Sequence, residues 1–224
     1  MLDKIIVMLT HNDVTVKNAY ELFDECKDLP VINWGFKDVG LEPEKMKELC
    51  QAMKKAGKNT FLEVVTYTEP ECMRGAKLAV ECGFDYLMGT LFYESVSEYC
   101  AEQGLKYLPF VGNVSGSPSI LEGTVEGMVD QAKFFLSKGA FGTDLLGYRY
   151  VNGNPEDLSA EFIKESPLPT VLAGSISSKA RLEKVKEMNP WLFTMGSALF
   201  TSNFVENGSV YENLKQVCEI LKEI

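Results

Sequence analysis

Three ionisable residues stand where this sequence would otherwise continue as a buried β-strand. Lys37 follows the apolar run "WGF", Glu63 interrupts "TFLEVVT", and Asp144 lies within "GTDLLGY". A charge in a buried strand is costly unless it is paired or used, so these three are the candidate catalytic residues. A carboxylate beside a lysine suits proton transfer next to a carbonyl group, because each group tunes the pKa of the other.

Each of these residues also has a purely structural interpretation. Lys37 can hold a substrate oxygen, form a Schiff base, or act as a base if burial lowers its pKa, but a surface lysine in a loop also fits. We expect Glu63 to point inward and meet Lys37, as a working pair or as a structural ion pair. We expect Asp144 to be a general acid or base, or else a partner for Arg149.

Two apolar runs near the end of the chain stop at a Gly-Ser pair, first in "VLAGSIS" and then in "LFTMGSALF". Glycine lets the backbone approach an anion, serine adds a hydroxyl donor, and a helix that starts there presents free N–H groups. A single Gly-Ser is also an ordinary turn or helix cap. Two such pairs in comparable positions favour phosphate binding by four residues: Gly174, Ser175, Gly196 and Ser197.

Four further residues are candidate substrate ligands: His11, Asp38, Asn113 and Arg149. His11 is the only imidazole of the chain, but the segment "THNDVT" is rich in capping residues and favours the start of a helix. Asn113 belongs to the long segment 112–124, "GNVSGSPSILEGT", whose Gly and Ser content is typical of a lid over a substrate.

The elements that must position these residues alternate regularly along the chain. Amphipathic stretches such as "EPEKMKELCQAMKKAG" predict helices between apolar runs, and a last one follows the eighth run. Eight such units close into an α/β fold, the (βα)8 TIM barrel, as a single domain over residues 1–224. An open doubly wound sheet is the alternative, although no GxGxxG follows the first strand. The predicted strands begin at Lys4, Pro30, Asn59, Phe84, Lys106, Gly142, Pro169 and Leu192.

Composition narrows the classes of ligand and partner. The net charge of −10 argues against nucleic acid and anionic membrane surfaces. With one histidine, six cysteines that form no CxxC pair and no nucleotide motif, we expect neither a metal nor a cofactor. The six-residue apolar run near the N-terminus is too short for a signal peptide or a membrane span, so we expect a cytoplasmic protein. General symmetry preferences favour a homodimer.

The segments "AGSI" and "MGSALF" resemble the phosphate grip of the ribulose-phosphate-binding barrels. In phosphate-binding barrels the anion lies between the loops after strands seven and eight. That superfamily includes the sugar isomerase of histidine biosynthesis and N-acetylmannosamine-6-phosphate 2-epimerase, so the resemblance implies a phosphorylated ligand. This chain has Leu9-Thr10 where the histidine-pathway isomerase has an aspartate, and it lacks both the DxKxxD motif and the paired metal-binding histidines found elsewhere in the group.

These features predict an enzyme that acts on a small phosphorylated sugar or keto acid. Proton abstraction next to a carbonyl would make it an isomerase or epimerase of carbohydrate metabolism. A lysine-dependent aldolase, a lyase on the same substrates, is the alternative, and a non-catalytic phosphate-binding barrel is the rival from another class. If Lys37, Glu63 and Asp144 converge on one cavity, the enzymes are favoured, whereas scattered positions favour the non-catalytic barrel.

Overall fold

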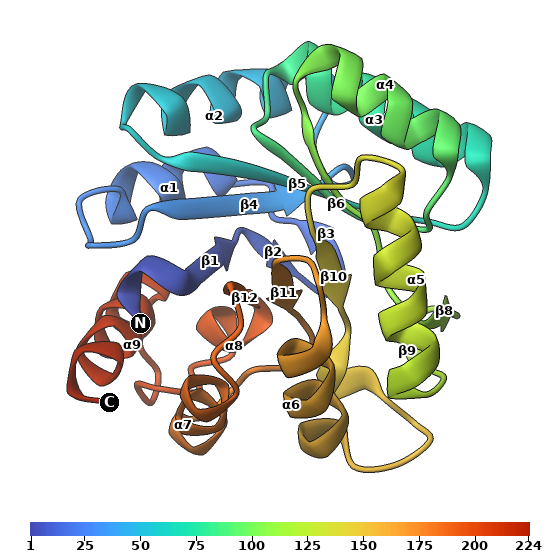
Figure 1. The fold of residues 1–224 in the computed structure, drawn as a ribbon. Coiled ribbons are helices and arrows are strands. Elements are labelled where there is room, and N and C mark those ends of the chain that lie inside the picture. The colour runs from blue at the N-terminus through green and yellow to red at the C-terminus, as the bar shows by residue number, and fades with distance from the viewer.

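The computed structural model describes residues 1–224 as a ring of parallel strands surrounded by helices (Figure 1). Between β7 and β10 the ring is closed by pairing of Phe110 with Asp144, and the Val111 N–H donates to the Asp144 carbonyl at 3.1 Å. The predicted (βα)8 barrel is therefore confirmed. In their order round the sheet the strands are β10 (Thr143–Leu145), β11 (Thr170–Leu172), β12 (Leu192–Met195), β1 (Ile5–Met8), β4 (Asn33–Lys37), β5 (Asn59–Thr66), β6 (Tyr86–Thr90) and β7 (Lys106–Leu108).

The helices lie outside the ring and cover it on all sides. Short helix α8 is an addition to the eight that the sequence pattern predicts, and it directly follows β12. Two 3₁₀ turns, η1 (Leu2–Lys4) and η2 (Gly147–Arg149), complete the set. The α-helices are α1 (Ala19–Cys26), α2 (Pro43–Lys55), α3 (Glu69–Cys82), α4 (Glu94–Gln103), α5 (Val125–Ser137), α6 (Pro155–Glu165), α7 (Lys179–Met188), α8 (Ser197–Phe200) and α9 (Val210–Glu223).

Alternation along each strand separates two apolar cores. One set of side chains packs outward against the helices in a large cluster, and the other set fills the ring itself. Lys37 and Glu63 each follow a ring-facing position by two residues, so their side chains also turn into the ring. The inner cluster consists of Ile6, Met8, Phe61, Tyr86, Met88, Leu108, Val171 and Leu192.

Aromatic rings close the ring at the end where the strands begin. Phe61 and Tyr86 stack with their centroids 4.3 Å apart, and Trp191 lies 5.7 Å from Tyr86. Phe141 packs at an angle against both Tyr86 and Trp191. We call these four residues the lower plug. Because they fill the interior, space for a ligand remains only at the opposite end, where the strands finish.

Two hairpins stand at that opposite end, and both differ from what the sequence pattern predicts. The "THNDVT" segment does not start a helix: it forms β2 (Thr10–His11) and β3 (Val14–Thr15), and α1 begins only at Ala19. Asn12 and Asp13 adopt positive φ angles of 51° and 63°, as a two-residue hairpin turn requires, and these residue types tolerate that conformation.

The segment expected to be a loop from 112 to 124 is also an ordered hairpin. Its strands are β8 (Asn113–Ser115) and β9 (Ile120–Glu122). The Tyr67 hydroxyl, just beyond β5, donates to the Gly116 carbonyl at 2.9 Å and lies 2.7 Å from the Ser119 Oγ. The tip of the hairpin is therefore attached to the rim of the barrel.

Candidate active site

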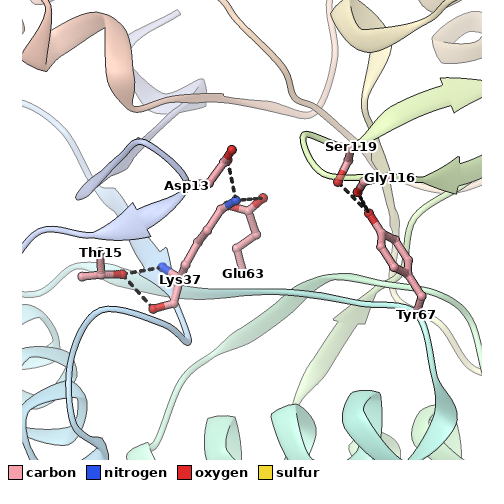
Figure 2. A network of polar contacts seen from close by, with 7 residues as sticks. All are labelled: Asp13, Thr15, Lys37, Glu63, Tyr67, Gly116 and Ser119. Atoms are coloured by element: carbon pink, nitrogen blue, oxygen red, sulfur yellow. Dashed lines mark hydrogen bonds and ion pairs between the residues drawn. The ribbon is translucent and has the colours of Figure 1, made fainter.

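Lys37 and Glu63 form the pair that the sequence predicts. They are register neighbours at the ends of β4 and β5, and the Lys37 Nζ lies 3.8 Å from the Glu63 Oε1. Their side chains are only 12% and 14% exposed. Figure 2 shows both side chains rising from adjacent strands toward the same point. Neighbouring parallel strands thus bring a buried cation and a buried carboxylate together.

Asp13 is a third member of this group that was not among the predicted site residues. Its carboxylate accepts a hydrogen bond from the Lys37 Nζ at 3.0 Å, which is closer than the contact with Glu63 (Figure 2). The hairpin is fixed to β4 at Thr15, whose Oγ1 accepts from the Lys37 N–H at 2.9 Å and donates to the Lys37 carbonyl at 2.7 Å. We call Asp13, Lys37 and Glu63 the charged side of the site.

The charges on this side shift each other's pKa values. Burial alone would lower the pKa of Lys37, but the carboxylates of Glu63 and Asp13 outweigh it, so the pKa is raised and the ammonium form is favoured. Burial raises the pKa of Glu63, and the nearby Lys37 charge only partly opposes this. The hydrogen bond from Lys37 lowers the pKa of Asp13. A firmly charged ammonium therefore faces a carboxylate that accepts protons more readily than an ordinary glutamate.

Asp144 lies in the ring, fully buried, and neither of its carboxyl oxygens has a hydrogen-bond partner. The alternative pairing with Arg149 is therefore not formed. Burial, reinforced by the charge of Glu63, raises the pKa of Asp144 well above its usual range. Its strand partner Phe110 lines the central cavity, so Asp144 lies just beneath the cavity wall.

The two Gly-Ser corners come together on the other side of the ring, and we call Gly174, Gly196 and Ser197 the glycine side. Gly174 has a φ of 97°, and a Cβ there would approach the Arg149 Cγ to 3.1 Å. A Cβ at Gly196 would come within 3.0 Å of the Thr10 carbonyl oxygen. The positive φ of Gly174 and the tight approach of the Thr10 carbonyl at Gly196 both favour glycine, so the backbone itself forms this surface.

One cavity of about 120 Å³ lies between the two sides. Its lining includes Lys37, Glu63, Arg149, Gly174, Gly196 and Ser197. A second space, which we call the Gly196 pocket, adjoins this cavity and has a volume of about 280 Å³. The Gly196 pocket shares Arg149 and Ser197 with the central cavity and is also lined by Ser175. The structure thus brings most of the predicted site residues into one connected space, with Asp144 beneath its wall.

The other predicted ligands lie farther from this space. Asp38 lines an adjoining pocket on the charged side, and burial raises the pKa of its carboxyl. Asn113 is exposed on β8 and does not line the cavity, because alternation in the hairpin turns Val114 inward instead. His11 stacks on Phe200 of α8 with centroids 5.5 Å apart, which places the imidazole behind the cavity wall.

The remaining reactive groups do not form another centre. All six cysteines are buried and unbridged, and burial raises the pKa of Cys26 and Cys100 to about 12. No three His, Cys, Asp or Glu side chains are grouped as metal ligands would be. None of the helices has both the length and the apolar character that crossing a membrane demands.

Comparison with known proteins supports the fold. No family model matches the sequence, and no curated protein matches it. Among solved structures, a mutant tryptophan synthase alpha-subunit from Pyrococcus furiosus is similar at 13% identity, with 99% of this chain and 98% of that chain covered and a TM-score of 0.68. The N-acetylmannosamine-6-phosphate 2-epimerase from Clostridium perfringens is similar at 11% identity, 92% and 93% coverage and a TM-score of 0.65.

A structure described as "Native KDPGal structure" is equally similar, at 11% identity, 98% and 94% coverage and a TM-score of 0.68. These structures are (βα)8 barrels of the ribulose-phosphate-binding superfamily. The resemblance drawn from the two Gly-Ser corners is confirmed at the level of the fold. At such identities the likeness concerns the fold alone, because this architecture carries many chemistries.

Proposed function

We propose that this protein is an isomerase or epimerase that moves a proton next to the carbonyl group of a small phosphorylated sugar or keto acid. The observation that carries the proposal is the shared cavity: Lys37 and Glu63 line one side, and Gly174, Gly196 and Ser197 line the other. A reacting group and an anion-binding surface therefore face one another across the space of a small molecule.

Glu63 is the base in this proposal. Its carboxylate is buried with a raised pKa, which increases its affinity for a proton taken from carbon. The C–H bond breaks, the proton moves to Glu63, and the electron pair shifts toward the carbonyl oxygen to give an enediolate. Return of the proton to the neighbouring carbon gives isomerisation, and its return to the other face of the same carbon gives epimerisation.

Lys37 stabilises the negative oxygen of that intermediate. Its ammonium group is held in place by Asp13 and Glu63 before any ligand arrives, so little rearrangement is needed when charge develops. A partly buried ammonium stabilises a negative oxygen more strongly than an ammonium in water does, because the surroundings screen its charge less. Asp144 lies buried beneath the cavity wall, and its raised pKa favours the protonated form there.

The glycine side anchors the phosphate. The first N–H groups of α8 have no partner within the helix, Ser197 supplies a hydroxyl, and Arg149 adds a positive charge at the boundary with the Gly196 pocket. With one end fixed in this way, the carbon chain is directed across the cavity toward Glu63.

Cleavage through a Schiff base on Lys37 is less well supported. Imine formation needs a neutral amine, and the raised pKa of Lys37 keeps the nitrogen protonated. The two chemistries also give different products with the same substrates: proton transfer exchanges hydrogen with solvent, whereas the lyase leaves a borohydride-reducible adduct on Lys37.

The test is an exchange experiment in D₂O with a panel of ketose, aldose and keto-acid phosphates, followed by NMR. The expected result is loss of one carbon-bound proton signal next to a carbonyl, abolished by Glu63→Gln and retained in Glu98→Gln, which removes an exposed charge on the outer helix α4. Activity should fall as pH decreases through the raised pKa of Glu63, because the base must be ionised.

Two outcomes would reject the proposal. Covalent trapping on Lys37 without proton exchange would assign the protein to the lyases. Tight binding of a phosphorylated ligand with neither exchange nor trapping in the whole panel would favour the non-catalytic barrel.

A further inference from the structure

We propose that the substrate of this site ends in hydroxyl groups opposite its phosphate, and that Asp38 makes the site reject ligands that end in a carboxylate. This inference rests on the proposed function, because it assumes that the phosphate lies on the glycine side. It chooses between the two substrate classes, since a keto acid carries a carboxylate and a sugar does not.

A third space, which we call the Asp38 pocket, adjoins the central cavity. It has a volume of about 200 Å³ and shares Asp13, Lys37 and Ser119 with the central cavity. It has no lining residue in common with the Gly196 pocket, which joins the central cavity from the glycine side. A ligand anchored in the Gly196 pocket and extended past Lys37 therefore enters the Asp38 pocket with its far end.

The charges around the Asp38 pocket favour a donor and disfavour an anion. The carboxylates of Asp13 and Asp38 line it together with a single ammonium, that of Lys37. That ammonium is already paired with Asp13 and Glu63. Arg74 also acts on Asp38 electrostatically, but it does not line the pocket. An incoming carboxylate would meet like charge here, and the one ammonium in the lining is already paired.

Hydroxyl groups complete the lining of the Asp38 pocket. Tyr67 and Ser119 form a hydroxyl pair at 2.7 Å where the β8–β9 hairpin reaches the barrel (Figure 2). No side chain hydrogen-bonds to the Asp38 carboxylate, and its own backbone N–H is the one donor that acts on it, so the carboxylate can still accept from a ligand. A hydroxyl-bearing ligand end can donate to Asp38 and exchange hydrogen bonds with Ser119, so each polar group of the pocket acquires a partner.

The experiment compares two probes that differ only at the far end. Glucitol 6-phosphate ends in a hydroxymethyl group and gluconate 6-phosphate in a carboxylate, while their remaining carbons and the phosphate are the same. Binding is measured by isothermal titration calorimetry near pH 8, roughly two units above the second pKa of a phosphate monoester, where ordinary carboxyl groups and phosphate monoesters are ionised. Inorganic phosphate is titrated in parallel to test the glycine side alone.

The wild-type protein is expected to bind the glucitol probe about tenfold or more tightly than the gluconate probe, because a like-charge contact costs at least one such factor. Asp38→Asn keeps the shape of the side chain and removes its charge, so it should bring the two affinities closer, mainly by improving the gluconate probe. Glu98→Gln, with the same change in net charge far from the site, should leave the preference unchanged.

The outcomes separate this inference from the proposed function. If inorganic phosphate and both probes bind and the two probes bind equally, or the gluconate probe binds more tightly, the inference is wrong while the phosphate site stands. If phosphate binds and neither probe does, the inference is again wrong. If none of the three ligands binds, both the phosphate site and the inference are wrong. A preference that persists unchanged in Asp38→Asn would remove Asp38 from the explanation.

Discussion

The two sides of the central cavity are built from different chemical groups. The charged side is made of side chains on β4, β5 and the β2–β3 hairpin, each of which changes the pKa of its neighbours. The glycine side is made of backbone at two positions where a Cβ would be in tight contact with Arg149 or with the Thr10 carbonyl. A surface of titratable side chains can exchange protons, whereas a surface of N–H groups can only bind. Substitutions on the two sides should therefore affect different steps.

Glu63→Gln is the substitution expected to have the largest effect. It keeps the size of the side chain and removes the base, so kcat should fall about 10²- to 10⁴-fold, the usual contribution of a general base. KM should change little, because the proposed phosphate site lies across the cavity. Steady-state kinetics with the exchanging substrate give both numbers. A fall in affinity without a fall in kcat would mean that the charged side only binds.

Ser197→Asp should give the opposite pattern on the glycine side. An acidic residue is favourable in the first turn of α8, so the fold should tolerate it, but its charge repels a phosphate. Affinity for phosphorylated ligands should fall by about 10- to 100-fold, with kcat nearly unchanged at saturation. Ser197→Ala is the matched control and should lose much less. Equal affinities of wild type and Ser197→Asp would place the phosphate elsewhere.

Asp144→Asn tests the raised pKa of the carboxyl beneath the cavity wall through its effect on stability. The folded pKa of Asp144 is raised, so above the ordinary pKa the unfolded chain releases a proton that the folded chain keeps, and stability falls as pH rises. The amide cannot ionise and removes that loss. The stability gain of the variant over wild type should grow with pH by up to about 1.4 kcal/mol per unit. Urea unfolding at several pH values measures it, and a pH-independent difference would contradict it.

Tyr67→Phe should have the smallest effect. Tyr67 lies where the tip of the β8–β9 hairpin is attached to the rim of the barrel. Removing one hydroxyl that bonds Gly116 and Ser119 costs about 0.5–1.5 kcal/mol. Amide exchange in residues 113–122 should become several-fold faster, and ligand should slow it in wild type if the hairpin acts as a lid. Unchanged exchange in the variant would show that other contacts hold the hairpin.

The strands and the two Gly-Ser corners could be predicted from the sequence because their signals are local. An apolar run that stops at Gly-Ser is visible without knowing what lies beside it, and the facing of Lys37 and Glu63 follows from neighbouring parallel strands. Asp13 could not be found in this way. Its contact with Lys37 joins residues 24 positions apart and depends on a turn with two positive φ angles.

The errors have equally physical causes. The two-residue strands on either side of Asn12 and Asp13 are too short to show alternation, and the residues that cap helices are also those that form tight turns. The sequence left open whether Asp144 pairs with Arg149 or acts as a general acid or base, and the pairing is not formed. The strand turns Asp144 into the ring, whereas Arg149 ends the following 3₁₀ turn and packs over Gly174.

The lower plug determines by which route molecules can enter and leave the cavity. Phe61, Tyr86, Phe141 and Trp191 close the barrel behind the cavity, so nothing passes through from one end to the other. Whatever enters past the two hairpins must leave by the same opening. An entering molecule and a leaving molecule therefore cannot use the opening at the same time. We expect turnover to slow as product accumulates, because product competes with substrate for this single opening.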